Sequence, residues 1–335
     1  MSGRVLVTGA TGFTGSHLVH ALAADGETVR VIARDAARAT AALPPGVEIV
    51  TGDVTDASLV NRAMAGVACV YHLAAAYREA GLPDQRYWDV HVGATRHLLQ
   101  AAHREGVKRF VHCSTVGVHS HIANPPADES WPHQPADVYQ ATKSEAEREA
   151  LAFSKTHGLP LTVARPTAIY GPGDLRLLKL FRLIAKRRFV ILGDGEIFYH
   201  MVYVDDLVRG LRLLATSPAA PGEVFILGGA DYRTLNQLAA MIARIVQAPP
   251  PRLKLPAWPF QLAGSACERI CKPLGIEPPI YRRRVDFFTK SRAFTIEKAR
   301  RVLGYEPQVS LEEGLARTAA WYREHGYLPA AASAA

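Results

Sequence analysis

The first third of the chain alternates short apolar runs with amphipathic stretches. Residues 5–7 form an apolar run that ends in a glycine-rich turn, and Leu18, Val19 and Leu22 follow at helical spacing. Further apolar runs predict strands at 28–33, 47–50, 68–73 and 109–113, with helices at 58–64 and about 87–104 among them. Strands that alternate with helices over short loops predict a parallel sheet with right-handed crossovers.

The pattern becomes less regular after Ser114. Asp137 can cap a helix that runs to about His157, and apolar runs predict later strands at 161–165 and 224–227. We therefore predict an α/β fold, a Rossmann-type doubly wound parallel sheet with a smaller, mixed C-terminal domain. The predicted core spans residues 1–170, and the second domain spans most of 171–330, with segments at about 200–230 returning to the core.

Composition limits the class of protein. The 335 residues are 48% hydrophobic and 21% charged, as in soluble globular proteins, and no run approaches the ~20 apolar residues of a spanning helix. The chain begins directly with a strand, so we expect no signal peptide and a cytoplasmic location. The four cysteines have no metal-binding or disulfide spacing, and we expect no metal site.

The net charge of +8 calls for an anionic partner. The basic residues are scattered and lack the interleaved aromatic residues of a nucleic-acid motif, so we expect no nucleic-acid partner. A multiply anionic small molecule, cofactor or substrate, explains part of the excess.

The glycine turn predicts a phosphate site. Gly9, Gly12 and Gly15, with Thr11 and Phe13 between them, stand between a predicted strand and a predicted helix. Glycine allows a sharp turn and a close approach of backbone to ligand, and the helix N-terminus attracts phosphate. This context predicts dinucleotide binding, which makes the core the cofactor domain and the second domain the substrate domain.

A phenol and an ammonium group share one face of the helix that follows Asp137. Tyr139 and Lys143 are four residues apart, and the positive charge of lysine favours the phenolate form of tyrosine. Such a pair can exchange a proton with an alcohol or ketone while hydride moves to or from a cofactor. Ser114 and Thr115 end a predicted strand and can polarise the substrate oxygen.

Together these motifs resemble the extended short-chain dehydrogenases/reductases, the NAD-dependent epimerase/dehydratase superfamily, and within it the 3β-hydroxysteroid-dehydrogenase-like branch. The resemblance runs from Arg4 to about Tyr322. The motifs that carry it are Thr8-Gly-Ala-Thr-Gly-Phe-Thr-Gly15, Gly52-Asp-Val-Thr-Asp56, His72-Leu-Ala-Ala75, Tyr139 with Lys143, Arg165-Pro166, Tyr170-Gly-Pro172 and Tyr203-Val-Asp-Asp206.

The resemblance implies roles for individual residues. Asp53 and Val54 would flank adenine, Ala74 and Ala75 would line the nicotinamide ribose, and Pro166 to Ile169 would meet the carboxamide. Thr115 rather than Ser114 would be the catalytic hydroxyl, Tyr139 the acid/base, and Lys143 its activator and a ribose ligand. A homodimer would form through the helices at about 87–104 and 137–157. Where the family usually has asparagine this chain has His91, which we interpret as a structural substitution.

The end of the second strand bears on the choice of cofactor. NAD enzymes of this class usually carry an acidic residue there, whereas this chain has Ala33 followed by Arg34, with Arg38 one helical turn later. A guanidinium group binds a 2′-phosphate well, so we favour NADP and keep NAD as the alternative. Asp35 could moderate this preference.

The substrate has two candidate classes. Tyr199 stands where nucleotide-sugar enzymes of this family carry a diphosphate-binding arginine, which favours a bulky, partly apolar, sterol-like alcohol or ketone. Arg292 and its basic neighbours could still meet a phosphate, so the alternative is a nucleotide-sugar 4-epimerase with tightly held NAD. Val116 argues against a sugar dehydratase, which places a carboxylate there. A cofactor-sensing protein is a third hypothesis, which the intact catalytic residues disfavour.

A basic amphipathic segment at residues 175–192 raises the question of membrane contact. Its six basic residues alternate with leucine, phenylalanine and isoleucine, and aromatic residues follow at 256–262. Such segments can lie on anionic lipid. We favour the alternative that this helix packs over the substrate cleft with a solvated basic edge.

Overall fold

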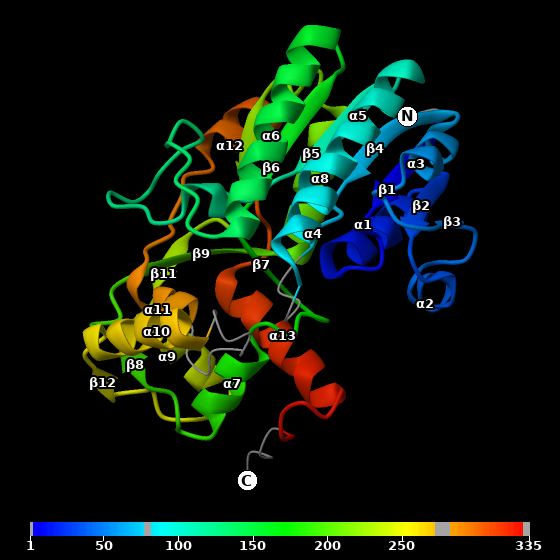
Figure 1. The fold of residues 1–335 in the computed structure, drawn as a ribbon. Helices are drawn as coiled ribbons and strands as arrows, with labels where there is room; N and C mark the ends of the chain where they lie inside the picture. The colour runs from blue at the N-terminus through cyan, green and yellow to red at the C-terminus, as the bar shows by residue number, and fades with distance from the viewer. Residues whose placement is uncertain (1–2, 77–81, 272–281, 331–335) are drawn as a thin grey trace.

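A seven-stranded parallel sheet organises the core of the molecule (Figure 1). The structure, a computed structural model, describes residues 3–76, 82–271 and 282–330. The strand order is β3-β2-β1-β4-β5-β6-β10. The strands are β1 (Arg4–Thr8), β2 (Val29–Ala33), β3 (Glu48–Thr51), β4 (Val67–His72), β5 (Arg109–Cys113), β6 (Leu161–Pro166) and β10 (Val224–Leu227). The order reverses between β1 and β4, so a cleft for ligands is expected beyond the carboxyl ends of these two strands.

Helices cover both faces of this sheet. The helices α3 (Ala57–Met64), α5 (Ala94–Arg104) and α6 (Val138–His157) bury their apolar residues on one face. The helices α1 (Phe13–Ala24), α8 (Val204–Thr216) and α12 (Glu297–Leu303) bury theirs on the other face. The short α2 (Ala36–Ala42) follows β2. Each strand except the edge strand β3 carries buried residues on both faces, as a parallel sheet requires.

One helix of the core contains a π-helical turn. The helix α4 (Asp84–Trp88) continues through the π turn η1 (Asp89–Gly93) into α5. A π turn inserts one extra residue and changes the direction of the side chains around it, which is why such turns recur at functional sites. The sequence predicts a single helix over about 87–104 and gives no sign of this turn.

A second lobe has its own apolar core. Its sheet, in the order β11-β9-β7, comprises β7 (Ala168–Tyr170), β9 (Phe198–Tyr203) and β11 (Tyr232–Thr234). The helices α7 (Leu178–Ala185), α9 (Leu235–Ile245) and α13 (Leu311–Glu324) bury apolar residues against it. A two-stranded sheet of β8 (Ile191–Leu192) and β12 (Lys254–Leu255), with α10 (Trp258–Cys271) and α11 (Arg282–Thr289), completes the lobe. The predicted fold class, a doubly wound parallel sheet with a smaller mixed part, is thus confirmed.

Candidate functional site

The glycine turn leaves no space for side chains. Gly9 has a φ of +74°, and a Cβ atom there would lie 2.7 Å from the amide nitrogen of Ala74. A Cβ atom on Gly15 would lie 2.1 Å from the carbonyl oxygen of Gly9. Gly12 caps α1 without a side-chain hydrogen bond, so the first N–H groups of the helix point to a ligand site. This close-packed turn and open helix end fit the pyrophosphate of a dinucleotide.

The loop before α7 packs against this turn. The guanidinium of Arg176 lies over the ring of Phe13, 5.5 Å from its centroid, and Gly173 lies beside the same ring. A ring nitrogen of His17 is 3.3 Å from the carbonyl oxygen of Pro172. The second lobe therefore directly contacts the glycine turn of the core and the first residues of α1.

Two arginines are exposed where β2 ends. Arg34 and Arg38 lie on the surface, while the carboxylate of Asp35 caps α2 by accepting the backbone N–H of Arg38 at 3.0 Å. The Asp35 carboxylate is thus engaged by the helix it precedes.

The residues expected to flank adenine follow β3. Val54 is buried, and the carboxylate of Asp53 accepts hydrogen bonds from the N–H and hydroxyl groups of Thr55, at 3.0 and 2.9 Å, and pairs with Arg86. Although partial burial raises the pKa of Asp53, the hydrogen bonds from Thr55 and Arg86 lower it below its ordinary value overall. Asp53 is therefore held as a carboxylate.

The predicted catalytic residues come from β5 and α6. Thr115 is half-buried directly after β5, and its hydroxyl oxygen accepts the N–H of Gly117 at 3.0 Å. Lys143 is buried, and its ammonium donates to the carbonyl oxygen of Cys113 at 2.5 Å. Burial lowers the pKa of Lys143. Tyr139 lies one helical turn before Lys143 on α6 and is half-buried.

Ser114, the alternative hydroxyl, is placed differently from Thr115. It is 4% exposed, and its hydroxyl oxygen is buried without a hydrogen-bond partner among the described residues. Thr115 is the more accessible of the two. This difference is consistent with the assignment of Thr115 by resemblance, which stays a prediction.

A chain of hydrogen bonds holds the loop after β4. The N–H of Ala74 donates to the Thr8 hydroxyl oxygen at 3.2 Å, and that hydroxyl lies 2.7 Å from Nδ1 of His72. Nε2 of His72 lies 3.0 Å from the hydroxyl of Thr95, which donates to the carbonyl oxygen of His91 at 2.5 Å. His72 therefore donates from Nε2 and accepts at Nδ1. Burial and the charge of Lys143 lower the pKa of His72 to about 3.

His91 links the same loop to the catalytic helix. The N–H of Ala76 donates to Nε2 of His91 at 3.0 Å, which places the ring proton on Nδ1, 2.8 Å from the hydroxyl of Thr142 on α6. The His91 ring also packs edge-on against Tyr139, with centroids 5.4 Å apart. Burial and the charge of Lys143 lower the pKa of His91 to about 2, so the ring is neutral.

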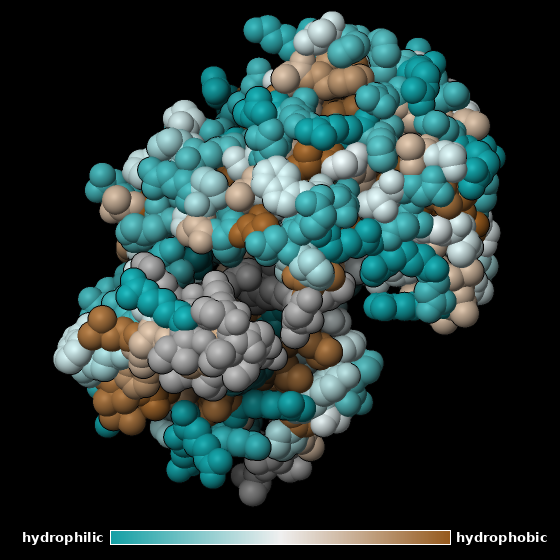
Figure 2. All heavy atoms as spheres, viewed as in Figure 1, coloured by the Kyte–Doolittle hydropathy of each residue, from teal (hydrophilic) through white to brown (hydrophobic). Residues whose placement is uncertain are grey.

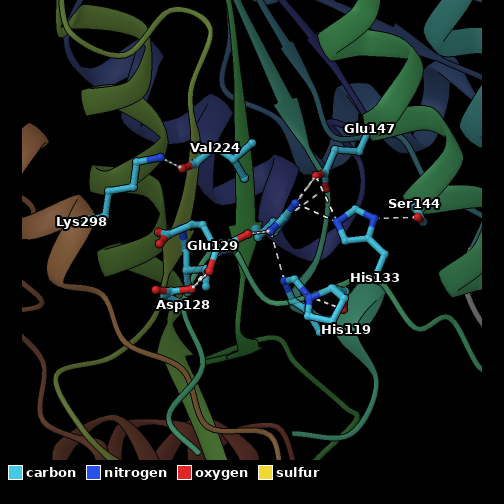
Figure 3. Close-up of polar contacts among 12 residues, drawn as sticks. His119, Asp128, Glu129, His133, Ser144, Glu147, Val224 and Lys298 are labelled. Carbon is cyan, nitrogen blue, oxygen red and sulfur yellow. Dashed lines mark hydrogen bonds and ion pairs between the residues drawn. The ribbon is translucent and has the colours of Figure 1, made fainter.

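An ion pair inside the protein anchors α6 to β6 (Figure 3). Arg165 pairs with Glu147, and both side chains are almost fully buried. The same guanidinium lies 3.1 Å from Nε2 of His119 and 2.8 Å from Nε2 of His133. His133 in turn lies 2.7 Å from the hydroxyl of Ser144 on α6. The loop between Thr115 and Tyr139, the predicted catalytic residues, is thus held through His119 and His133.

The remaining predicted residues surround the junction of the two lobes. Pro166 ends β6 opposite Leu227, and Ile169 is half-buried in β7. Tyr199 is 9% exposed, and its hydroxyl donates to the carbonyl oxygen of Phe287 on α11. Arg292 forms backbone hydrogen bonds with β9. The hydroxyl of Tyr199 is therefore already used within the lobe, and the role of both residues toward substrate stays a prediction.

Sequence reasoning singled out His91 as a structural substitution, but it missed the partners of the residues that support this site. Arg165 and Glu147 are 18 positions apart, and His91 and Thr142 are 51 apart, so only the folded chain brings them together. Among the described residues, no cluster of three or more His, Cys, Asp or Glu side chains could hold a metal ion. Within the same residues, no helix is both long and apolar enough to cross a bilayer.

Comparison with known proteins shows the family. The model of the NAD dependent epimerase/dehydratase family matches residues 5–228. A 3 beta-hydroxysteroid dehydrogenase/Delta 5-->4-isomerase of Mycobacterium tuberculosis is 32% identical, over 96% of this chain and 90% of the relative. Sterol demethylase protein B of Methylococcus capsulatus is 32% identical, over 96% of this chain and 99% of the relative.

Solved structures agree with this placement. The dTDP-glucose 4,6-dehydratase DesIV of Streptomyces venezuelae, solved with NAD bound, has a TM-score of 0.76 and 29% identity. The match covers 97% of this chain and 99% of the other. The chain therefore belongs to the NAD-dependent epimerase/dehydratase family and is a nicotinamide-dinucleotide-dependent enzyme of the extended short-chain dehydrogenases/reductases, in their 3β-hydroxysteroid-dehydrogenase-like branch.

Proposed function

We propose that the enzyme interconverts a secondary alcohol and a ketone on a bulky, partly apolar, sterol-like substrate. The observation that carries the chemistry is the placement of Lys143, which is buried on the same helix as Tyr139 and donates to the carbonyl oxygen of Cys113, two residues before Thr115. This holds a positive charge one helical turn from the Tyr139 phenol and favours its ionised form. When bound, the nicotinamide dinucleotide supplies the hydride donor or acceptor.

Each catalytic residue has one task in this proposal. Tyr139 takes the proton from the substrate hydroxyl in oxidation and returns it to the ketone oxygen in reduction. The Thr115 hydroxyl donates to the same oxygen and orients it. Lys143 stabilises the phenolate and donates to the cofactor ribose. The loop of Ala74 and Ala75, fixed by hydrogen bonds, lines the site.

The sterol-like substrate class rests on two observations. Tyr199 offers no guanidinium for a sugar diphosphate, and its hydroxyl is engaged by α11. The two relatives described above carry sterol or steroid names. The likeness to a sugar-nucleotide dehydratase keeps a nucleotide-sugar 4-epimerase as the second candidate.

Net reduction of added cofactor distinguishes the proposed dehydrogenase from a nucleotide-sugar 4-epimerase. With a 3β-hydroxysteroid, we expect stoichiometric formation of reduced cofactor, measured by its absorbance. With a UDP-sugar, we expect neither reduction of added cofactor nor epimer formation. Epimerisation without added cofactor would replace the first proposal with the second.

Replacing Tyr139 with phenylalanine tests the proton transfer. Without the phenol, kcat should fall about 10²- to 10⁴-fold, because general acid–base catalysis contributes on that scale. The dissociation constant of the cofactor, measured by fluorescence titration, should change little. Tyr327→Phe, on the second lobe, is the matched control, and full activity in Tyr139→Phe would favour a cofactor-sensing role.

NADP is the proposed cofactor, with NAD as the alternative. Arg34 and Arg38 are exposed at the end of β2, and the nearby carboxylate of Asp35 is engaged as a helix cap. Arg34→Ala should raise the KM for NADP about tenfold to a hundredfold, since a hydrogen bond to a charged group contributes about 1.5–3 kcal/mol. The KM for NAD should stay the same. An unchanged ratio of the two KM values would contradict this assignment.

We further propose a homodimer that forms through the outer faces of α5 and α6. These helices pack side by side on one face of the sheet (Figure 1). A small-molecule substrate, no nucleic-acid partner and a cytoplasmic location stay predictions of the sequence.

A further inference from the structure

Large apolar side chains are exposed in one short segment of the second lobe. Among the described residues, six large hydrophobic side chains are strongly exposed, and four of them lie within residues 253–262. They are Leu253 (56%), Leu255 (37%), Trp258 (64%) and Leu262 (63%). Single exposed leucines are ordinary, whereas such a concentration marks an interaction surface.

The backbone presents these side chains together. Leu253 and Leu255 flank one residue of β12, which puts them on the same side of that strand. The strand is held by hydrogen bonds from Ile191 and Gly193 to Leu253 and Leu255, at 3.0 and 2.8 Å. Trp258 and Leu262 are four residues apart on α10 and share one helix face. Figure 2 shows hydrophobic atoms gathered over the end of the lobe where β12 and α10 lie.

Basic side chains border this apolar surface. Lys186, Arg187 and Arg188 are exposed just before β8, the partner strand of β12, and Arg252 is exposed just before Leu253. None of these four cations forms an ion pair with any residue that the structure describes. The sequence from 175 to 192 contains six basic residues and no acidic residue. These four side chains therefore carry positive charge that no ion pair within the described part of the chain neutralises.

We propose that residues 186–188 and 252–262 form a lipid-facing surface that binds anionic bilayers. Indole and leucine side chains insert at the level of the headgroups, while lysine and arginine beside them meet anionic lipid phosphates. The uncompensated positive border favours an anionic bilayer over a second copy of this chain, whose identical surface would repel it.

The sequence offers both the segment 175–192 and the aromatic residues of 256–262 for membrane contact, and this surface uses the second but not the apolar face of the first. The apolar residues of α7, among them Leu178, Phe181 and Ile184, are buried in the core of the second lobe. That helix cannot insert its apolar face into lipid. It contributes only the cations that follow it, and the inserting side chains come from β12 and α10.

Vesicle binding tests this surface without any measurement of activity. Full-length protein is sedimented with vesicles of phosphatidylcholine alone, or with about 30% phosphatidylglycerol. We expect binding to the anionic vesicles only, weakening as NaCl is raised. Trp258 emission should shift to shorter wavelength on binding. No binding, or binding that is insensitive to salt and lipid charge, would overturn the proposal.

Two variants with matched controls separate the contributions of the apolar and the basic side chains to vesicle binding. Trp258→Ser/Leu262→Ser, and separately charge reversal to Glu at Lys186, Arg187 and Arg188, should each reduce the partition coefficient at least about tenfold. Trp88→Ser is the control for the first variant. Reversal to Glu at Arg62, Lys108 and Arg301, which are exposed on the lobe of the seven-stranded sheet, changes net charge equally and is the control for the second.

The outcomes of these controls decide the proposal. Retained vesicle binding in both controls, with native circular dichroism in all variants, would support it. An equal loss of binding in the charge control would show only attraction by net charge and overturn it. Loss of a dimer in Trp258→Ser/Leu262→Ser, seen by size-exclusion chromatography with light scattering, would assign the surface to a second copy and overturn it as well.

Discussion

Among single residues, the substitution at His91 has a structural explanation. His91 accepts the N–H of Ala76 and donates to Thr142, so it joins the loop after β4 to the helix that carries Tyr139. Its neutral ring fills a position where the family usually has asparagine. We infer that His91 positions Tyr139 and does not itself exchange protons, because its pKa is lowered to about 2.

Substitution of His91 tests this positioning role. His91→Ala leaves the buried N–H of Ala76 without its acceptor. It should lower kcat about tenfold to a hundredfold, since small displacements of a catalytic group have effects of that size. His91→Asn should restore much of kcat, because an amide can accept and donate in the same place. The pH profile of kcat should keep its shape in both variants. Loss of one limb of that profile in His91→Asn would contradict a positioning role.

At the scale of elements, β6, α6 and the loop before α6 are joined by Arg165. A guanidinium group can only donate, so Nε2 of both His119 and His133 must accept from it. Their protons therefore lie on Nδ1, which donates to the carbonyl oxygen of Pro132 in one ring and to the Ser144 hydroxyl in the other. Protonation at Nε2 would break these contacts and add charge beside Arg165. Burial and Arg165 lower the pKa of His119 to about 4.

The contact of His119 with Arg165 should make the free energy of unfolding depend on pH. His119 binds a proton near pH 6.5 when unfolded but only near pH 4 when folded, so its stabilising contribution is complete above pH 6.5 and is lost as the pH falls toward 4. In that interval, the free energy of unfolding should fall less steeply in His119→Gln, by about 1 kcal/mol per pH unit. Urea titrations at several pH values measure this slope. His20→Gln, at an exposed position on α1, is the control, and equal slopes in the two variants would contradict the assignment.

Local patterns predict elements well and long-range contacts poorly. Apolar spacing predicts β1 to β6 and α6, and the spacing of Tyr139 and Lys143 places both on one face of that helix. The turn η1 is missed because one extra residue hardly changes helical periodicity. The pairing of Arg165 with Glu147 is missed because neither residue has a local signal for its partner. A signal for α8 is also present, since Leu207, Leu211 and Leu214 recur at helical spacing.

At the scale of the whole molecule, two surfaces on different lobes are candidates for association. The outer face of α6 presents Ala141, Glu145, Arg148 and Ala152, and Glu149 beside it pairs with Arg96 of α5. The lipid-facing surface lies on the other lobe, at the end formed by β12 and α10 (Figure 1). A dimer formed through α5 and α6 would leave both copies of the lipid-facing surface accessible.

This arrangement predicts that dimer formation and lipid binding can be separated. Ala152→Arg places a long charged side chain in the proposed dimer interface and should convert the dimer to a monomer in light scattering, because an unpaired buried charge costs several kcal/mol. Ala37→Arg, at an exposed position on α2, should remain dimeric. Since the lipid-facing surface is on the other lobe, the monomeric variant should still sediment with anionic vesicles, although more weakly, because each particle then carries one such surface in place of two. A wild-type chain that is monomeric at micromolar concentration would refute the dimer, whereas a monomeric variant without vesicle binding would show that the two surfaces depend on one another.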